Sequence, residues 1–179
     1  MPAIVIPYRG DAKRRLPSSL RAALAVAMLG DVVEAARQVG RVLVVTDDPS
    51  VVPSGAEIVA DPGEGLGAAV AAGLELVDGP ALVVNADVPA ATPEALRRLS
   101  NAGLALVEAA DGTTNALSLP DPRVFVPLYG PNSAQRFRAH GFATTRIPEL
   151  EVDVDSDADL ERIGARVGPR TRALLAVPA

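Results

Sequence analysis

The stretch PALVVNADVPAATPEAL, residues 80–96, decides the fold. Its apolar, β-branched run at Ala81–Val84 predicts a short strand that is buried on both faces. Thr92-Pro93-Glu94 supplies an N-cap hydroxyl, a proline at the first helical position and an acid in the first turn, which predicts a helix start. Asp87 stands between them, at the carboxyl end of the strand, where open α/β sheets bind ligands. Position alone is equally consistent with an ordinary loop aspartate.

The composition favours one α/β domain over residues 1–179. The hydrophobic content is 49%, mostly Ala, Val and Leu, and there is no tryptophan. Such a core suits a parallel sheet covered by helices. The absence of cysteine excludes disulfides and thiolate zinc sites, and the single histidine, His140, argues against a histidine metal site or a Ser-His triad.

Charge and hydropathy restrict the partners. The net charge is −5 and the few aromatic residues are not interleaved with basic ones, so nucleic-acid binding is disfavoured. No apolar run approaches membrane-spanning length, and the N-terminus enters a strand without a leader pattern. We therefore expect a soluble, cytoplasmic protein with no membrane partner.

The order of elements predicts a mixed, mainly parallel sheet flanked by helices. Helices are predicted to begin near Pro17, with a break at Gly30-Asp31, and near residues 68, 92, 133, 157 and 168. Strands are predicted over 3–7, 41–46, 56–60, 80–85, 104–108, 115–119 and 142–147. No helix separates the strands at 104–108 and 115–119, so these two should be antiparallel.

A glycine-rich loop, Gly63-Glu64-Gly65-Leu66-Gly67-Ala68, matches the dinucleotide fingerprint G-x-G-x-x-A. It would support an NAD-binding oxidoreductase. However, it follows the third predicted strand rather than the first, and Asp61-Pro62 intervenes. The same loop could cradle a phosphate or sugar at a helix N-terminus, or could simply be a tight turn.

Cations cluster directly after the first strand, at Arg9, Lys13, Arg14 and Arg15. Like charges on one loop repel one another unless an anion lies among them, and a triphosphate would serve. A solvated charge run is the alternative.

Carboxylates cluster in the segment Glu151–Asp155, which reads as extended. Residues two apart on an extended chain point the same way, so Asp153 and Asp155 should face out together while Val152 and Val154 face the core. Together with Asp87 they could form an all-oxygen site that suits Mg²⁺.

Two further loops carry short polar groups. The segment Gly130-Pro131-Asn132-Ser133 has two interpretations. It could be no more than a helix cap formed by Asn132 or Ser133, or it could present donors to a phosphate or carboxylate. The turn at Thr113-Thr114 has the same two interpretations. His140 is expected to close the helix that follows.

These pieces together resemble one family. The segments are Ala12-Lys13-Arg14-Arg15-Leu16, Asn85-Ala86-Asp87-Val88-Pro89, Asp111–Leu117, Gly130–Ser133 and Asp153-Val154-Asp155. In this order they resemble the phosphoenolpyruvate and 2-phospho-L-lactate guanylyltransferases of coenzyme F-420 biosynthesis, which are similar to molybdenum-cofactor guanylyltransferases. The resemblance implies a GT-A-like nucleotidyltransferase fold.

The resemblance also implies a reaction and roles for residues. GMP would pass from GTP to phosphoenolpyruvate or 2-phospho-L-lactate, and pyrophosphate would leave. Lys13, Arg15 and Asp87 would be catalytic, with the two cations facing the triphosphate. Gly65 would contact the nucleotide, and the acceptor phosphate would be held by Thr114, Gly130 and Ser133. Mg²⁺ would be held by Asp87, Asp153 and Asp155.

Three alternatives stay open at this point. A molybdopterin or sugar-phosphate nucleotidyltransferase would share the aspartates but need another acceptor pocket. An NAD-binding oxidoreductase would depend on Gly63–Ala68. A non-catalytic nucleotide-sensing module would keep the fold without turnover.

Overall fold

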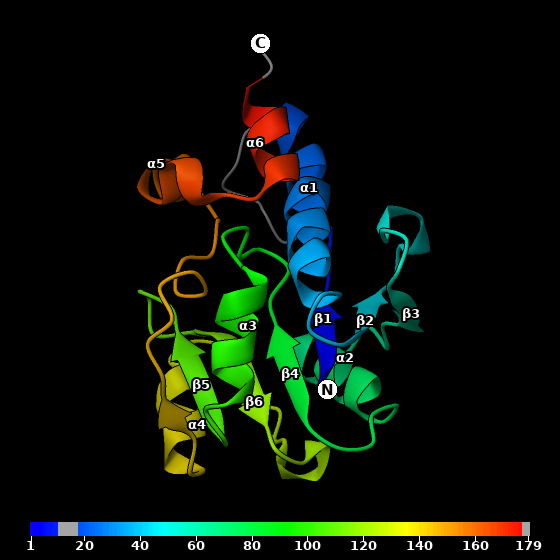
Figure 1. Ribbon diagram of the computed structural model, residues 1–179, viewed down its shortest axis with the longest axis vertical. Coiled ribbons are helices and arrows are strands. Elements are labelled where there is room, and N and C mark those ends of the chain that lie inside the picture. Colours follow the sequence, from blue (N-terminus) through cyan, green and yellow to red (C-terminus); the bar gives the residue numbers. More distant parts are fainter. Residues whose placement is uncertain (11–17, 177–179) are drawn as a thin grey trace.

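Seven strands form one mixed sheet in the order β3-β2-β1-β4-β6-β5-β7 in the computed structural model, which describes residues 1–10 and 18–176 (Figure 1). The strands are β1 Ala3–Pro7, β2 Arg41–Thr46, β3 Glu57–Ala60, β4 Ala81–Val84, β5 Ala105–Glu108, β6 Thr114–Leu119 and β7 Ala143–Thr144. The helices are α1 Ser18–Ala36, α2 Leu66–Leu74, α3 Pro93–Ser100, α4 Ser133–Ala139, α5 Asp157–Ile163 and α6 Pro169–Leu175.

The pairing of the strands confirms the predicted fold class. β1 pairs in parallel with β2 and β4, and β2 pairs in parallel with β3. β6 lies between β4 and β5 and is antiparallel to both; its pairing with β5 is the one predicted, because the short turn at residues 109–113 joins these two strands. β4 is therefore the middle strand of the seven. The loop that follows its carboxyl end lies midway along the row of strand ends.

Alternate residues of the central strands pack into two hydrophobic clusters, one on each face of the sheet. Ile4, Ile6 and Val44 belong to the cluster packed under α1 and α3, whereas Val5 and Val45 belong to the cluster under α2 and α4. Figure 1 shows these two pairs of helices on opposite faces of the sheet. Because side chains alternate along a strand, a continuous apolar run is what a sheet covered on both faces requires.

The predicted break in the first helix is wrong. α1 runs without interruption from Ser18 to Ala36 and includes Gly30 and Asp31. The buried Asp31 carboxylate accepts the backbone N–H groups of Arg170 and Thr171, both at 2.9 Å, and so caps the start of α6. A Cβ on Gly30 would lie 2.4 Å from Cδ of Arg170, so the glycine admits the packing of α6 rather than ending the helix.

Other boundaries shift less. The strand predicted over 142–147 forms a ladder only at Ala143–Thr144, at the open edge next to β5, although Thr145 N–H still donates to the Leu106 carbonyl at 2.9 Å. A capping box starts α5, because the side chains of Ser156 and Asp159 each accept a hydrogen bond from the other residue's backbone N–H. No helix in the described ranges is both long and apolar enough to cross a membrane.

Candidate active site and metal centre

Three carboxylates converge beyond the carboxyl end of β4. Asp87, Asp153 and Asp155 each offer an oxygen, and these oxygens all lie within 4.8 Å of one another. The buried Val154 donates its backbone N–H to the carbonyl of Asp87 at 2.9 Å. This bond holds the C-terminal segment against the loop after β4, with the flanking aspartates half-buried beside Asp87. The structure thus brings together the three residues that the sequence singles out.

The electrostatics of this cluster favour a cation. The pKa of Asp153 is raised to about 6, mainly because burial penalises its charge and next because Asp87 lies close; Asp155 adds a smaller effect. Negative charge is therefore concentrated where oxygen ligands already face one another. Carboxylate oxygens are among the ligands that hold Mg²⁺ in proteins, usually together with water and substrate phosphates.

Asn115 orients one of these carboxylates, and the sequence interpretation gave it no role. It lies in β6 and is 1% exposed. Its side-chain amide donates to the Leu150 carbonyl at 3.1 Å and to Oδ1 of Asp153 at 3.3 Å. Its place directly after Thr114 in the run D-G-T-T-N-A-L is the signal that could have identified it.

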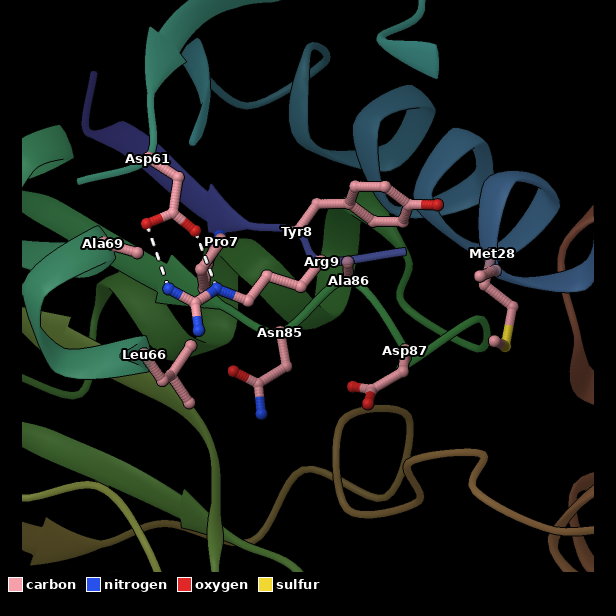
Figure 2. Close-up of a pocket in the computed structure, with 11 residues that line it drawn as sticks. Pro7, Tyr8, Arg9, Met28, Asp61, Leu66, Ala69, Asn85, Ala86 and Asp87 are labelled. Carbon is pink, nitrogen blue, oxygen red and sulfur yellow. Dashed lines mark hydrogen bonds and ion pairs between the residues drawn. The ribbon is translucent and has the colours of Figure 1, made fainter. Parts of the chain in front are cut away.

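A cavity of about 210 Å³ opens next to Asp87 (Figure 2). It is lined by Pro7, Tyr8, Arg9, Ala25, Met28, Asp61, Leu66, Ala69, Asn85, Ala86 and Asp87. These residues come from the carboxyl ends of β1 and β4, from α1, from α2 and from the loop between β3 and α2. The walls combine apolar side chains with a few polar groups, as ligand cavities usually do.

An ion pair spans one end of this cavity. Nε of Arg9 donates to Oδ2 of Asp61 at 2.7 Å and Nη2 donates to Oδ1 at 3.1 Å, as Figure 2 shows. These hydrogen bonds lower the pKa of Asp61. Asp61 also accepts the N–H of Gly63 at 2.8 Å and so shapes the glycine-rich loop.

Gly65 has a structural requirement of its own. Its φ of 103° lies in the region that disfavours side chains, and it stands directly before α2. Its neighbour Leu66 lines the cavity. The loop follows β3 at the edge of the sheet, whereas a dinucleotide fingerprint follows the first, central strand, so the NAD-binding interpretation gains no support.

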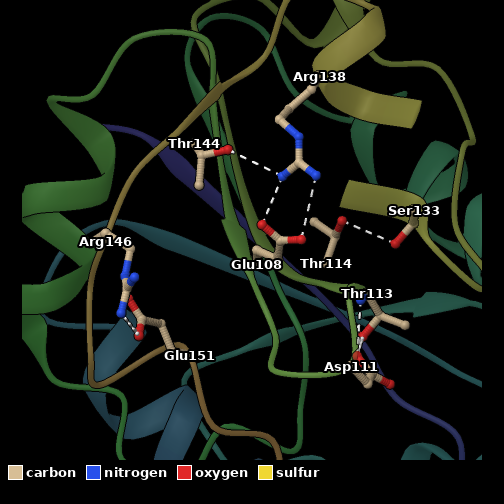
Figure 3. A network of polar contacts seen from close by, with 9 residues as sticks. All are labelled: Glu108, Asp111, Thr113, Thr114, Ser133, Arg138, Thr144, Arg146 and Glu151. Atoms are coloured by element: carbon tan, nitrogen blue, oxygen red, sulfur yellow. Dashed lines mark hydrogen bonds and ion pairs between the residues drawn. The ribbon is translucent and has the colours of Figure 1, made fainter. Parts of the chain in front are cut away.

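The predicted acceptor residues Thr114 and Ser133 meet in the interior (Figure 3). The Ser133 hydroxyl donates to Oγ1 of Thr114 at 3.0 Å, and both residues are buried. Of the two interpretations of this loop, the side-chain cap is not formed: Ser133 turns to Thr114, and Asn132 stands at the N-cap with a left-handed φ of 57° and no side-chain cap bond.

Gly130 lies in a loop held by Arg136. The guanidinium of Arg136 donates to the carbonyls of Leu128, Tyr129 and Pro131, at 2.7 to 3.1 Å. Gly130 has a φ of 114°, which explains the glycine. His140 closes α4 at its C-cap, as expected.

The remaining predicted site residues, Lys13 and Arg15, lie outside the described residues, as does Arg14 between them. The loop that carries them follows β1, so its start at Arg9 adjoins the cavity.

Comparison with known proteins defines the class. The family model for the MobA-like NTP transferase domain matches residues 19–140. The chain is also similar in fold to solved nucleotidyltransferases. One is a nucleotidyl transferase from Methanothermobacter, with a TM-score of 0.67 at 19% identity over 98% of each chain. Another is 2-C-methyl-D-erythritol 4-phosphate cytidylyltransferase from Thermus thermophilus, with a TM-score of 0.62 at 18% identity over 97% of this chain and 98% of that one.

Sequence relatives identify the family within this class. The phosphoenolpyruvate guanylyltransferase of Streptomyces coelicolor is 35% identical, over 97% of this chain and 95% of the relative. The 2-phospho-L-lactate guanylyltransferase of Natrialba magadii is 33% identical, over 89% and 82%. The chain belongs to the phosphoenolpyruvate/2-phospho-L-lactate guanylyltransferase family of MobA-like nucleotidyltransferases.

Proposed function

We propose that this protein transfers GMP from GTP to phosphoenolpyruvate, with release of pyrophosphate, as a step of coenzyme F-420 biosynthesis. An oxygen of the acceptor phosphate attacks the α-phosphorus of GTP, and the bond from that phosphorus to the β-phosphate bridging oxygen breaks. The nucleophile is already anionic, so no general base is needed. What remains for the protein is alignment and charge stabilisation.

The convergence of Asp87, Asp153 and Asp155 is the observation that carries this proposal. Their oxygens lie within 4.8 Å of one another, and the pKa of Asp153 is raised first by burial and next by the nearby Asp87 carboxylate. This donor set fits Mg²⁺, which when bound supplies charge neutralisation between two anionic substrates. The three aspartates would hold the ion, and Asn115 would keep Asp153 turned toward it.

The nucleotide would occupy the cavity beside Asp87. Its volume of about 210 Å³ and its apolar walls, among them Leu66 and Ala69, suit a nucleobase. Gly65 would let the backbone approach the nucleotide. Lys13 and Arg15 would neutralise the triphosphate from the loop after β1.

The acceptor phosphate would lie on the other side of the metal centre, toward β6. Thr114 receives the Ser133 hydrogen and keeps its own hydroxyl hydrogen as a donor. The backbone at Gly130, held by Arg136, would add further donors. These short polar groups suit a compact acid with a phosphate and a carboxylate, and the scarcity of aromatic residues disfavours a stacked pterin.

Pyrophosphate release tests the proposal. The protein would be incubated with GTP, Mg²⁺ and one acceptor at a time: phosphoenolpyruvate, 2-phospho-L-lactate, a sugar 1-phosphate or molybdopterin. Mass spectrometry would identify the product. We expect guanylylated phosphoenolpyruvate to dominate, since the more similar relative carries that name and the Arg- and Ala-rich, Lys-poor composition is typical of GC-rich bacteria.

Other outcomes would redirect the assignment. Dominant guanylylation of 2-phospho-L-lactate would keep the reaction and change the acceptor. Transfer to a sugar phosphate or a pterin alone would contradict the proposed pathway. Binding of GTP without turnover with any acceptor would favour a nucleotide sensor.

A further inference from the structure

Strand β6 holds Asn85 through both its backbone and its side chain. Its backbone N–H donates to the Asn115 carbonyl at 2.9 Å, and its side-chain Nδ2 donates to the Thr114 carbonyl at 3.2 Å. Turning the amide over would set two oxygens against each other, so the nitrogen must face Thr114. The oxygen Oδ1 is therefore an acceptor whose direction the fold has set.

This oxygen lacks what a buried acceptor needs. Oδ1 of Asn85 is buried and has no hydrogen-bond partner among the residues that the structure describes. Buried polar groups in native proteins are nearly always bonded, so one that is not calls for an explanation.

The place of Asn85 suggests what the missing donor is. Asn85 lines the cavity, and in Figure 2 its side chain lies between the Arg9 guanidinium and the Asp87 carboxylate. On the proposed function, on which this inference rests, Asp87 marks the α-phosphate. The ribose is joined directly to that phosphate, and the base lies beyond it, toward Asp61 and Leu66. A ribose hydroxyl is thus the donor nearest to Asn85.

We propose that Oδ1 of Asn85 accepts a hydrogen bond from a ribose hydroxyl of the bound nucleotide. The contact makes the enzyme prefer ribonucleotides to deoxyribonucleotides. A deoxynucleotide leaves the acceptor buried and unsatisfied, which is the situation in which a polar site discriminates most strongly.

A cycle that combines substrate and protein changes tests this contact. Initial rates would be measured for wild type and Asn85→Ala with GTP, 2′-deoxy-GTP and 3′-deoxy-GTP. We expect wild-type kcat/KM to fall at least tenfold for one of the two deoxynucleotides, which identifies the hydroxyl. Asn85→Ala should lose a similar factor with GTP and should no longer distinguish GTP from that deoxynucleotide.

A merely structural Asn85 would give a different pattern. The substitution would then lower kcat/KM by the same factor for all three nucleotides and leave the discrimination intact, which would overturn the proposal. Asn101→Ala, at an exposed asparagine after α3, is the matched control and should keep the wild-type preference. If Asn85→Ala does not fold, wild type alone decides, because equal use of all three nucleotides contradicts the contact.

Binding separates this inference from the proposed function. Calorimetric titration of wild type with GTP and with each deoxynucleotide, without acceptor, needs no turnover. Weaker binding of one deoxynucleotide supports the ribose contact even if no acceptor is guanylylated. Equal binding of all three overturns it even if GMP transfer is found.

Discussion

Asp61 and Asp153 are two half-buried carboxylates at the same edge of the sheet. The charge next to Asp61 is positive, whereas the charges next to Asp153 are negative. Asp61 accepts two hydrogen bonds from the Arg9 guanidinium, and these bonds lower its pKa. Asp153 receives hydrogen bonds from neutral groups, among them the Asn115 amide; it lies close to two other carboxylates, and its pKa is raised to about 6. The fold therefore supplies a cation to the first carboxylate, and within the described residues it supplies no ion pair to the second.

This difference separates a carboxylate that is paired within the protein from carboxylates that are available to a ligand. Asp61 is compensated within the protein, so its charge supports the loop that it shapes. The charges at Asp153, Asp87 and Asp155 raise the free energy of the metal-free fold, because like charges in a partly buried site are costly. A site that is costly when empty is one that a cation from solution can stabilise.

The largest expected effect is on catalysis. Asp87→Ala should lower guanylyl transfer about a thousandfold or more, on the order of 4 kcal/mol of transition-state stabilisation, because it removes one of the three carboxylates proposed to hold the metal ion. Pyrophosphate release measures this, and circular dichroism should show an intact fold. Glu94→Gln, at an exposed acid in α3, is the control; near-wild-type turnover in Asp87→Ala would contradict the metal centre.

The next effect concerns metal affinity. Asn115→Leu removes the amide that orients Asp153, and loss of such a supporting hydrogen bond typically weakens metal binding by about 10- to 100-fold. Titration with Mn²⁺, followed by electron paramagnetic resonance, reads this without turnover. Asn101→Leu should bind Mn²⁺ like wild type, and unchanged affinity in Asn115→Leu would show that Asp153 needs no orientation.

A smaller effect is expected in the loop after β1. Lys13→Ala should lower kcat/KM for GTP at least tenfold, about 1.4 kcal/mol, if the cation neutralises the triphosphate. Steady-state kinetics at fixed acceptor concentration measures this. Arg21→Ala, a cation in α1, provides a matched control. Wild-type kinetics for Lys13→Ala would mean that the loop is a solvated charge run.

The smallest effect is on the free energy of unfolding of the metal-free protein, and it tests the comparison of Asp61 with Asp153 directly. Asp61→Asn should lower the free energy of unfolding by about 1–3 kcal/mol, because it weakens a charge-assisted pair. Asp153→Asn should raise that free energy near neutral pH, because it removes crowded charge. Each kcal/mol corresponds to about 2–4 °C in melting temperature for a chain of this size. Shifts of the same sign would contradict the distinction.

The pH dependence of the same metal-free protein follows from the two pKa shifts. The folded state binds a proton at Asp153 more tightly than the unfolded chain does, so this residue's contribution to stability falls as the pH rises from about 4 to about 6. Asp61 acts in the opposite sense, and its contribution is lost as the pH falls below the ordinary carboxyl range. Excess Mg²⁺ should offset the Asp153 effect alone.

Much of the fold could be predicted because local patterns and the global structure agree. The apolar run at Ala81–Val84 is a buried central strand, and Thr92 caps the helix that follows. The break at Gly30 was predicted wrongly because glycine and aspartate end helices on local grounds. Here they serve α6, which lies about 140 residues further along the chain.

The sequence by itself determined the residue types and their local directions: a carboxylate at the end of a buried strand, two more that point the same way from an extended segment, and glycines where φ is positive. Only the tertiary structure decided the pairings. It joined Asp153 to Asn115 across 38 residues, Arg9 to Asp61 across 52, and Ser133 to Thr114 across 19. Periodicity and capping depend on neighbours within a few residues, whereas these contacts depend on which strands the sheet places side by side.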